Sequence, residues 1–413
     1  MSRPEVITMG CRLNLAESNA LAEQLGDKDN LVIVNSCAVT NEAVRQTRQA
    51  IRQARKRRPD ARIIVTGCAA QVEPDSFVAM PEIDAVLGNA EKARPALFGH
   101  GLNERVRVSD IMSVRQTAPH LATAFDGKTR AFVEIQTGCD HRCTFCIIPY
   151  GRGNSRSVPA GLVVDHIQKL VEGGAKEVVL TGVDVTSYGH DLPGSPTLGQ
   201  LVERILKHVP ALPRLRLSSV DGVEIDDRLF ALLTLERRVM PHVHLSLQSG
   251  DNLILKRMKR RHSREQAIDL VARMKTARPE ISIGADIIAG FPTEDEAMLE
   301  NSLRLVDECE IVHGHIFPYS RKAGTPAAKM PQVASAEIKA RAKALRERVA
   351  VRRENWLAAQ VGLTKSVLVE RSGFSGHAGD FSIVELDRQA EPGSIVSVQI
   401  GSAQHDKLQG SIL

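Results

Sequence analysis

The chain has 413 residues, which is enough for two or three domains, and 43% of them are hydrophobic, which is enough for a large core. The formal net charge of +5 is only mildly basic, so any contact with nucleic acid must come from local patches of charge. No run of about 18 apolar residues occurs, which excludes a membrane-spanning helix, and the N-terminal residues do not form a signal-peptide pattern. We therefore expect a cytoplasmic protein without a membrane partner, whose seven cysteines are reduced and bind metal rather than form disulfides.

Residues 1–105 alternate between short β-branched runs and helical patterns, which is typical of a domain built on an open parallel α/β sheet. The expected strands are 6–9, 31–34 and 62–65, and the expected helices are 14–26 and 41–58. Each strand is followed within two or three residues by a cysteine, namely Cys11, Cys37 and Cys68. Because ligands of an open α/β sheet bind at the carboxyl ends of its strands, these thiols should converge and form a metal site. The alternative is that they are three unrelated buried cysteines.

A second α/β domain is expected at residues 125–357, after a segment at 106–128 that has no periodicity and is expected to be a linker. The expected strands are 132–136, 178–180, 215–217, 243–247, 282–288 and 313–317, with helices at 159–172, 197–207, 264–277 and 294–307 between them, and a long basic helix follows at 335–358. Six such units predict an incomplete (βα)6 barrel, in which the chemistry lies on loops at the carboxyl ends of the strands.

The loop after the first of these strands carries three thiols, Cys139, Cys143 and Cys146, in a Cys-x3-Cys-x2-Cys spacing. Thiolates suit iron–sulfur clusters, zinc or Cu(I), but a structural zinc site normally has four ligands from two paired motifs, and no second Cys-x2-Cys pair exists. Three local ligands instead suit a [4Fe–4S] cluster with one iron left open to a substrate or cofactor. A zinc clip or an unliganded group of thiols is the alternative. Cys309 has no metal-spaced partner and is expected to be structural.

Residues 360–413 change to an all-β pattern, with short strands expected at 366–370, 380–385 and 395–400 and glycine or proline turns between them. This length suffices for a small β-barrel. The segment resembles the TRAM domain, a small RNA-binding β module, and a purely structural cap is the alternative.

The cysteine loop, with Phe145 directly before Cys146, resembles the radical S-adenosylmethionine (SAM) superfamily, in which the open iron chelates SAM. Three cysteines in an N-terminal α/β domain, this barrel and a TRAM-like module together resemble the radical SAM methylthiotransferase family along essentially the whole chain. The residues at 34–41, 150–157, 185–189 and 257–262 are most similar to the branch that acts on N6-threonylcarbamoyladenosine in tRNA. At Asp221-Gly222 the chain departs from the family, which more often has Glu-Pro there.

The resemblance implies an enzyme that methylthiolates C2 of threonylcarbamoyladenosine beside the anticodon, giving 2-methylthio-N6-threonylcarbamoyladenosine. It implies a radical SAM [4Fe–4S] cluster on Cys139, Cys143 and Cys146, an auxiliary [4Fe–4S] cluster on Cys11, Cys37 and Cys68, and two SAM molecules per turnover. The expected SAM contacts are Phe145, Gly182, Asp184, Gln248, Ile288 and Gly290, and the expected RNA or substrate contacts are Arg152, Arg156, Lys259, Arg260 and Arg261. No catalytic residue is expected beyond the cluster ligands.

The expected partners are a tRNA anticodon stem-loop, a reductant such as flavodoxin or ferredoxin, and a sulfur source. Two alternatives stay open at this point. A sibling methylthiotransferase, acting on isopentenyladenosine in tRNA or on a ribosomal-protein aspartate, would share every cluster cysteine. From another class, the protein could be a non-catalytic RNA-binding protein whose metal is structural.

Overall fold

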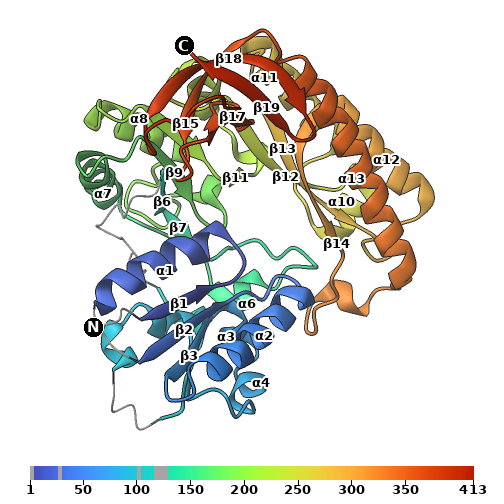
Figure 1. Ribbon diagram of the computed structural model, residues 1–413. Coiled ribbons are helices and arrows are strands. Elements are labelled where there is room, and N and C mark those ends of the chain that lie inside the picture. The colour runs from blue at the N-terminus through green and yellow to red at the C-terminus, as the bar shows by residue number, and fades with distance from the viewer. Residues whose placement is uncertain (1–3, 27–29, 100–103, 116–128) are drawn as a thin grey trace.

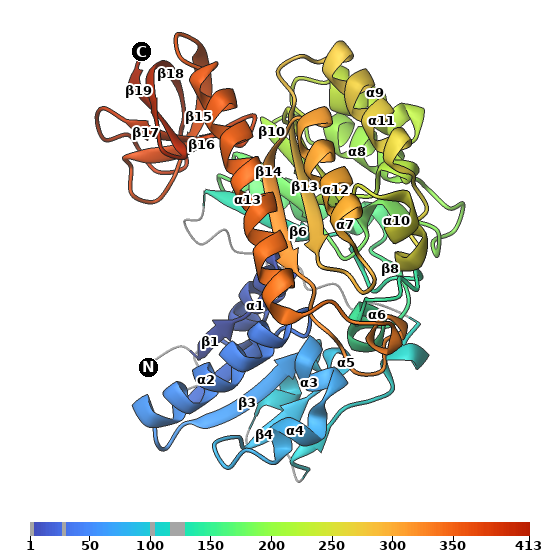
Figure 2. The same cartoon turned by 90° about the vertical axis from the view of Figure 1, so that its right-hand side faces the viewer.

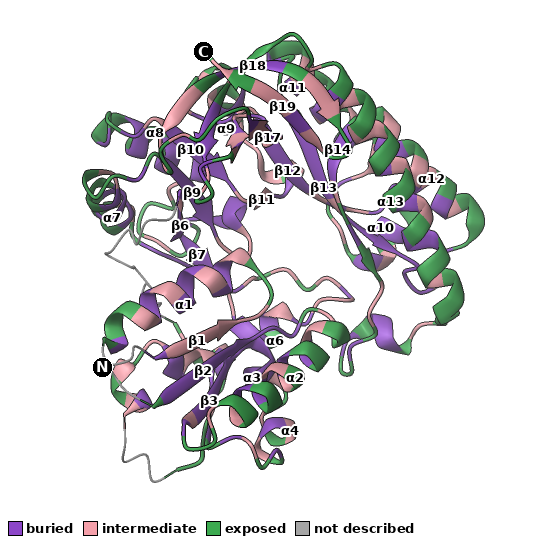
Figure 3. Ribbon diagram, viewed as in Figure 1, coloured by how far each residue is buried: buried purple, intermediate pink, exposed green. Residues whose placement is uncertain are grey.

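The computed structural model describes residues 4–26, 30–99, 104–115 and 129–413, and the chain folds into three parts (Figure 1). An N-terminal α/β domain and a small C-terminal β-barrel lie at opposite ends of a central partial barrel, as the view in Figure 2 makes clear. The central strands of the two α/β parts, such as β2, β3 and β9, are largely buried, whereas the helices present their outer faces to solvent (Figure 3). No helix within the described ranges is both long and apolar enough to cross a membrane.

The N-terminal domain is a parallel sheet whose strands follow one another in sequence order, as predicted. The strands are β1 (Glu5–Thr8), β2 (Leu31–Ser36), β3 (Arg62–Gly67), β4 (Ala85–Leu87) and β5 (Val106–Arg107), and the helices are α1 (Arg12–Leu25), α2 (Asn41–Arg57), α3 (Cys68–Val72), α4 (Pro74–Val78) and α5 (Asn89–Lys92). The predicted linker is wrong at its start, because Val106 pairs with Val86 and adds β5 to the sheet. Residues 116–128 of that predicted linker lie outside the described residues.

The central part is the predicted incomplete barrel, with two parallel sheets that meet at a bend in one strand. The strands are β6 (Arg130–Glu134), β9 (Glu177–Thr181), β10 (Arg214–Leu217), β11 (Ser219–Val220), β12 (His242–Gln248), β13 (Ser282–Ala289) and β14 (Ile311–Pro318). Ser218 separates β10 from β11, so that one interrupted strand belongs to both sheets and the six predicted units are all present. Gln136–Thr137 (β7) and Arg156–Ser157 (β8) form a small antiparallel pair beside the cysteine loop.

Helices cover the outer face of the partial barrel and bury its main hydrophobic core. They are α6 (Ile148–Arg152), α7 (Ala160–Glu172), α8 (Leu198–His208), α9 (Asp227–Leu235), α10 (Asn252–Met258), α11 (Arg264–Ala277), α12 (Glu296–Glu308) and α13 (Ser335–Ala358). The predicted bounds of α11 are confirmed, because Ser263 and Gln266 form a capping box that fixes where it begins. Cys309 is fully buried in this core, as expected of a structural thiol.

The C-terminal part is a closed five-stranded barrel, which confirms the predicted fold of this segment. Its strands are β15 (Thr364–Val369), β16 (Ser375–Ala378), β17 (Ile383–Leu386), β18 (Ile395–Gln404) and β19 (Lys407–Ile412), of which β16 and β19 were not predicted. The barrel docks where the central strands begin: Ser282 Oγ donates to the carbonyl of Asp380 at 2.6 Å, and Arg130 pairs with Glu370 at 2.8 Å. The C-terminal barrel therefore closes the floor of the partial barrel, opposite the cysteine loop.

Candidate active site

The cysteine loop lies between β7 and α6 at the carboxyl end of the first barrel strand, where the sequence predicts it. Backbone and side-chain hydrogen bonds from Thr144 to the carbonyls of Met258 (3.1 Å) and Arg257 (2.8 Å) tie the loop to the end of α10. Burial raises the pKa of Cys146 to about 12, and burial together with Asp184 raises the pKa of Cys139. Three free, partly buried thiols fit a cluster that leaves one position open, and a bound metal would compensate for their desolvation.

Charged side chains surround this loop in an alternating network. His141 Nε2 lies 2.9 Å from Asp184, and Arg260 pairs with Asp221 at 2.9 Å while its Nη1 lies 3.8 Å from Cys143 Sγ. Burial opposes ionisation of Asp184, but hydrogen bonds from His141 and Ser187 keep its pKa below the ordinary value. The Asp221 carboxylate, at the point where the sequence departs from the family that it resembles, therefore positions a cation beside the cysteine loop.

Gln136 connects the cysteine loop to the next strand end, and the sequence did not single it out. Its Oε1 accepts from the backbone N–H groups of Val183 (3.1 Å) and Asp184 (2.9 Å), and its Nε2 donates to the carbonyl of Gly138 at 2.8 Å. A Cβ on Gly182 would come within 2.7 Å of the Gln136 carbonyl, so only glycine fits this turn. An amide at the end of the expected strand 132–136, directly before the cysteine loop, is the signal that could have identified Gln136.

The six expected SAM contacts fall at the carboxyl ends of the barrel strands, in two groups. Gly182 and Gln248 line a central cavity, and Asp184 adjoins them, with its carboxylate 3.8 Å from Cys139 Sγ. Phe145 packs with Ile288 in an apolar cluster and meets the Phe291 ring edge-on at 6.3 Å. Gly290 has a φ of +71°, which favours glycine, and follows β13 next to this cluster.

Cys11, Cys37 and Cys68 come together on one wall of the cavity, each after its own strand of the N-terminal sheet. The turn before α1 lies directly against Cys37, because a Cβ on Gly10 would come within 2.6 Å of Cys37 Sγ. Burial raises the pKa of Cys37 to about 11, and the neighbouring Cys68 and Cys11 add to this effect. Soft donors that oppose one another's ionisation fit a metal cluster, which would hold all three as thiolates.

The expected substrate contacts Arg152 and Arg156 are both buried and hydrogen-bonded within the protein. Arg152 is buried and makes a bidentate ion pair with Glu17, at 2.8 and 3.0 Å, and a further hydrogen bond to Asn14 at 2.6 Å. Arg156 is also buried and donates to the carbonyls of Asn154 and Arg152. Arg152 thus holds the loop after Cys146 against the N-terminal domain, and Arg156 stabilises the loop itself, so their assignment as substrate contacts stays a prediction.

The three basic residues after α10, namely Lys259, Arg260 and Arg261, differ in how far they are exposed to solvent. Lys259 is exposed at the helix C-terminus, in the left-handed conformation with a φ of +59°. Arg260 is almost fully buried beside the cysteine loop, and Arg261 is 39% exposed and pairs with both Asp221 and Glu224. Lys259 and Arg261 therefore lie where an RNA could reach them, whereas Arg260 belongs to the surroundings of Cys143.

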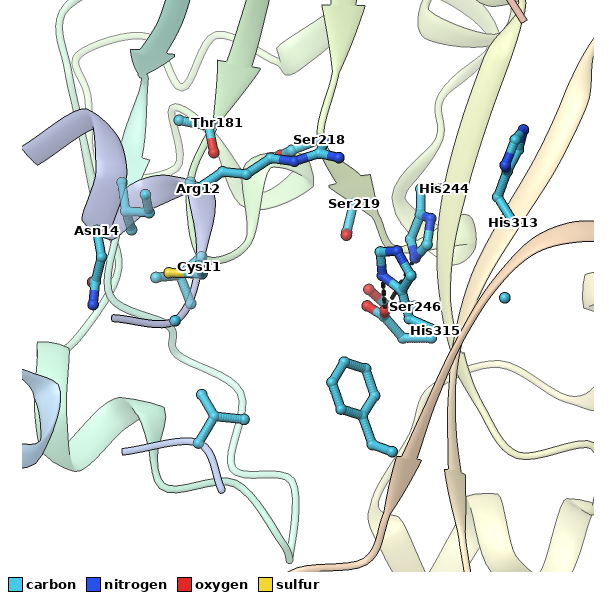
Figure 4. Close-up of a pocket in the computed structure, with 18 of the residues that line it drawn as sticks. Cys11, Arg12, Asn14, Thr181, Ser218, Ser219, His244, Ser246, His313 and His315 are labelled. Carbon is cyan, nitrogen blue, oxygen red and sulfur yellow. Dashed lines mark hydrogen bonds and ion pairs between the residues drawn. The ribbon is translucent and has the colours of Figure 1, made fainter. Parts of the chain in front are cut away.

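The cavity lined by Cys11, Cys37 and Cys68 has a volume of about 770 Å³, within the usual range of small-molecule sites (Figure 4). Its wall opposite Cys11 carries His244 and His315, which share Asp286 at 3.0 and 3.3 Å. The repeated His-x-His pattern at 242–244 and 313–315 could have identified this wall, because alternate residues of a strand face the same side. The cavity is thus bounded by thiols on one side and hydrogen-bonding side chains on the other.

Comparisons with known proteins agree with this architecture. Residues 133–306 match the radical SAM superfamily, and residues 3–88 match the uncharacterized protein family UPF0004. The threonylcarbamoyladenosine tRNA methylthiotransferase MtaB of Rickettsia prowazekii is 50% identical over 403 residues, covering 96% of this chain and 94% of the relative. A tRNA-2-methylthio-N(6)-dimethylallyladenosine synthase of Erythrobacter litoralis is 32% identical, covering 99% and 96% of the two chains.

Among solved structures, a radical SAM methyltransferase, TsrM, from Kitasatospora setae superposes with a TM-score of 0.57. It covers 79% of this chain and 77% of that chain at 16% identity, and this likeness concerns the fold alone. The sequence relatives, by contrast, match from end to end and share the tRNA methylthiotransferase activity in their names. The chain therefore belongs to the radical SAM tRNA methylthiotransferase family.

Proposed function

We propose that this protein methylthiolates C2 of N6-threonylcarbamoyladenosine beside the anticodon of tRNA, giving 2-methylthio-N6-threonylcarbamoyladenosine. The observation that carries the proposal is a single cavity with one set of three cysteines on its wall and the turn beside the second set at its rim. A reaction that both activates a C–H bond and delivers sulfur needs two such sites close to one substrate. The name of the 50%-identical relative supports the choice of nucleoside.

Cys139, Cys143 and Cys146 would hold the radical SAM [4Fe–4S] cluster, and Cys11, Cys37 and Cys68 would hold an auxiliary [4Fe–4S] cluster. When bound, these groups and two SAM molecules per turnover supply one-electron reduction, hydrogen abstraction from C2, and the sulfur and methyl group that are added. Phe145, Gly182, Asp184, Gln248, Ile288 and Gly290 are the proposed SAM contacts. The protein's own task is to position these groups and to keep water away from a reactive intermediate.

We further propose a division of labour along the chain. Residues 1–105 carry the auxiliary cluster, residues 125–357 carry SAM chemistry, and residues 360–413 contribute to RNA binding. Lys259 and Arg261, on the surface next to the cysteine loop, are the proposed contacts to the anticodon stem-loop. A reductant such as flavodoxin or ferredoxin and a sulfur source complete the system, which we place in the cytoplasm.

The test is anaerobic turnover of the reconstituted enzyme with three anticodon stem-loops, read by mass spectrometry of their nucleosides. The stem-loops carry threonylcarbamoyladenosine, isopentenyladenosine or unmodified adenosine, and we expect methylthiolation of the first alone. Equal reaction of the isopentenylated RNA would favour the sibling activity named for the Erythrobacter relative. Iron-loaded protein that neither cleaves SAM nor modifies any RNA would instead support a non-catalytic RNA-binding role.

A further inference from the structure

Arg12, the residue after Cys11, extends into the cavity toward Ser218 on the barrel side (Figure 4). Its guanidinium carbon lies 5.4 Å from the centre of the Phe381 ring and 5.9 Å from that of Phe132. Among the described residues it makes no hydrogen bond or ion pair. Arg12 is partly buried, and a ligand that covered its guanidinium without providing an acceptor would remove water from its N–H groups at a cost in free energy.

Three arginines lie near the cavity without lining it, and they already have acidic partners. Arg130 pairs with Glu370 at 2.8 Å, and Arg214 and Arg216 both pair with Glu177, at 3.6 and 2.9 Å. The carboxylates of Glu177 and Glu370 thus face three arginines, and the Asp286 carboxylate is shared by His244 and His315. Arg12 therefore adds a positive charge that has no carboxylate partner among the described residues.

Two neutral groups beside Arg12 also lack partners. Ser218 Oγ is buried without a hydrogen bond, and so are both ring nitrogens of His242, which is 4% exposed. Both residues line the same cavity as Arg12. Buried polar groups are almost always hydrogen-bonded, so several orphaned groups in one cavity indicate a polar ligand. Together with the positive charge of Arg12, they indicate a ligand that carries a negative charge.

We propose that Arg12, assisted by Ser218, binds the carboxylate of the threonylcarbamoyl group and is thereby the residue that selects this substrate, an inference that rests on the proposed function. C2 and N6 of adenine lie on the same edge of the base. A base with C2 next to the sulfur-bearing site at Cys11 therefore directs its N6 substituent into the cavity along Arg12. The guanidinium can donate to both carboxylate oxygens in bidentate geometry, and the anion offsets the repulsion from Arg130 and Arg216.

The same arrangement explains rejection of an apolar substituent. An isopentenyl group in this position would leave Arg12, Ser218 and His242 buried and unpaired. A site built for polar groups rejects an analogue without them by about 10⁴-fold or more, because its own buried groups then lose water without gaining a partner. Arg12 therefore selects the substrate because binding an apolar substituent would leave its guanidinium without a hydrogen-bond acceptor.

The test compares two anticodon stem-loops that differ only in the substituent's terminal group, the native carboxylate and the neutral carboxamide. For the wild-type holoenzyme, we expect kcat/KM to be about 100-fold higher with the carboxylate, the value of a charge-assisted bidentate pair. In Arg12→Gln this ratio should fall to about one, mainly because the carboxylate substrate reacts more slowly. Arg12→Lys, which keeps the charge but not the planar fork, should give an intermediate ratio.

Arg273→Gln is the matched control, because Arg273 also lies over an aromatic ring, that of Phe230 at 4.9 Å, but on the exposed surface of α11. Its ratio should equal that of the wild type. Equilibrium binding of the two stem-loops without SAM should show the same preference, and iron per chain is measured for every variant. If Arg12→Gln binds less iron than the wild type, the kcat/KM ratio of Arg12→Lys is compared with the wild-type ratio instead.

Equal reaction of the wild type with carboxylate and carboxamide would overturn the assignment of Arg12, and so would an unchanged ratio in iron-loaded Arg12→Gln. In either case the proposed function would stand, because the carboxylate substrate would still be methylthiolated. Methylthiolation of neither stem-loop by the wild type would refute the proposed function and this inference with it.

Discussion

Replacement of Phe381 by alanine tests how the C-terminal barrel closes the floor of the active-site cavity. Phe381 lies in the turn between β16 and β17, in the left-handed conformation with a φ of +68°. Three guanidinium groups, those of Arg12, Arg130 and Arg216, lie 4.9–5.4 Å from the ring centre. The ring also stacks on His242 at 5.0 Å. One side chain of the last domain thus contacts residues from both of the others.

The expected cost follows from these contacts. A phenylalanine-to-alanine change in a packed site costs about 3–5 kcal/mol, and a half-buried ring with three cation–π contacts of about 0.5–1 kcal/mol each should fall near 3 kcal/mol. Phe381→Gly loses the same contacts, but glycine adopts a positive φ without the steric penalty of about 1–2 kcal/mol. The glycine variant should therefore be more stable than the alanine variant, by about 1 kcal/mol, which is the reverse of the usual order.

The assay is urea unfolding followed by fluorescence of Trp356, the only tryptophan of the chain. The indole lies 5.2 Å from the His313 ring, which itself meets Phe381 at 5.9 Å, so its signal reports on this junction. Phe374→Ala, a 53% exposed phenylalanine of the same barrel, is the control and should change stability by about 0.5 kcal/mol or less. An unchanged midpoint in Phe381→Ala, or a glycine variant less stable than the alanine variant, would refute the reasoning.

Further predictions concern the two cysteine sets and acid stability. Cys143→Ala should lower the iron content after anaerobic reconstitution by about half and abolish SAM cleavage; cleavage at the wild-type rate would contradict the assignment. Replacing Cys11, Cys37 and Cys68 together should also halve the iron but stop methylthiolation while SAM cleavage continues, as measured by 5′-deoxyadenosine release. Burial lowers the pKa of His313 from 6.5 to about 3, so below pH 6.5 the unfolded chain takes up a proton that the folded chain does not. Stability should therefore fall by about 2 kcal/mol at this site between neutral pH and pH 5, and His313→Gln should show a correspondingly smaller loss in urea titrations at the two pH values.

Elements that bury a periodic apolar face could be predicted from the sequence, and those that depend on backbone pairing alone could not. The barrel strands and α11 combine apolar runs with caps, and their predicted positions are confirmed. By contrast, β5 consists of two exposed residues, Val106 and Arg107, whose strand conformation comes only from pairing with β4. Strands β16 and β19 each include glycine, which weakens the β-propensity that a local pattern detects.

Cysteines could be assigned to candidate sites from sequence, whereas the roles of arginines could not. A thiol is a potential metal ligand whatever its neighbours are, and parallel topology brings the carboxyl ends of strands together. An arginine acts through its partner, and the partner of Arg152 is Glu17, which lies 135 positions earlier in the chain. The charged stretch after Cys146 therefore looked available to substrate although its guanidinium groups are paired. The sequence did not identify Arg12 as a candidate site residue, because it is a single cation in a segment of ordinary charge. The residues that surround it come from the central barrel and from Phe381, which are distant in the sequence.

The two cysteine sets are linked more directly than their separation in the sequence indicates. The chain runs from Cys146 straight into α6, whose Gly151 lies so close to Cys68 that a Cβ there would come within 3.2 Å of the Cys68 Cβ. Asn89 Nδ2 donates to the Gly151 carbonyl at 2.6 Å and lies 3.8 Å from Cys68 Sγ, which fixes this contact from the N-terminal side. One short helix thus spans from the ligands of one site to the wall of the other. The distance between the sites is set by covalent geometry and close packing, so a substrate has to fit the cavity between them, and a side chain such as Arg12 that projects into that fixed space can discriminate between substituents.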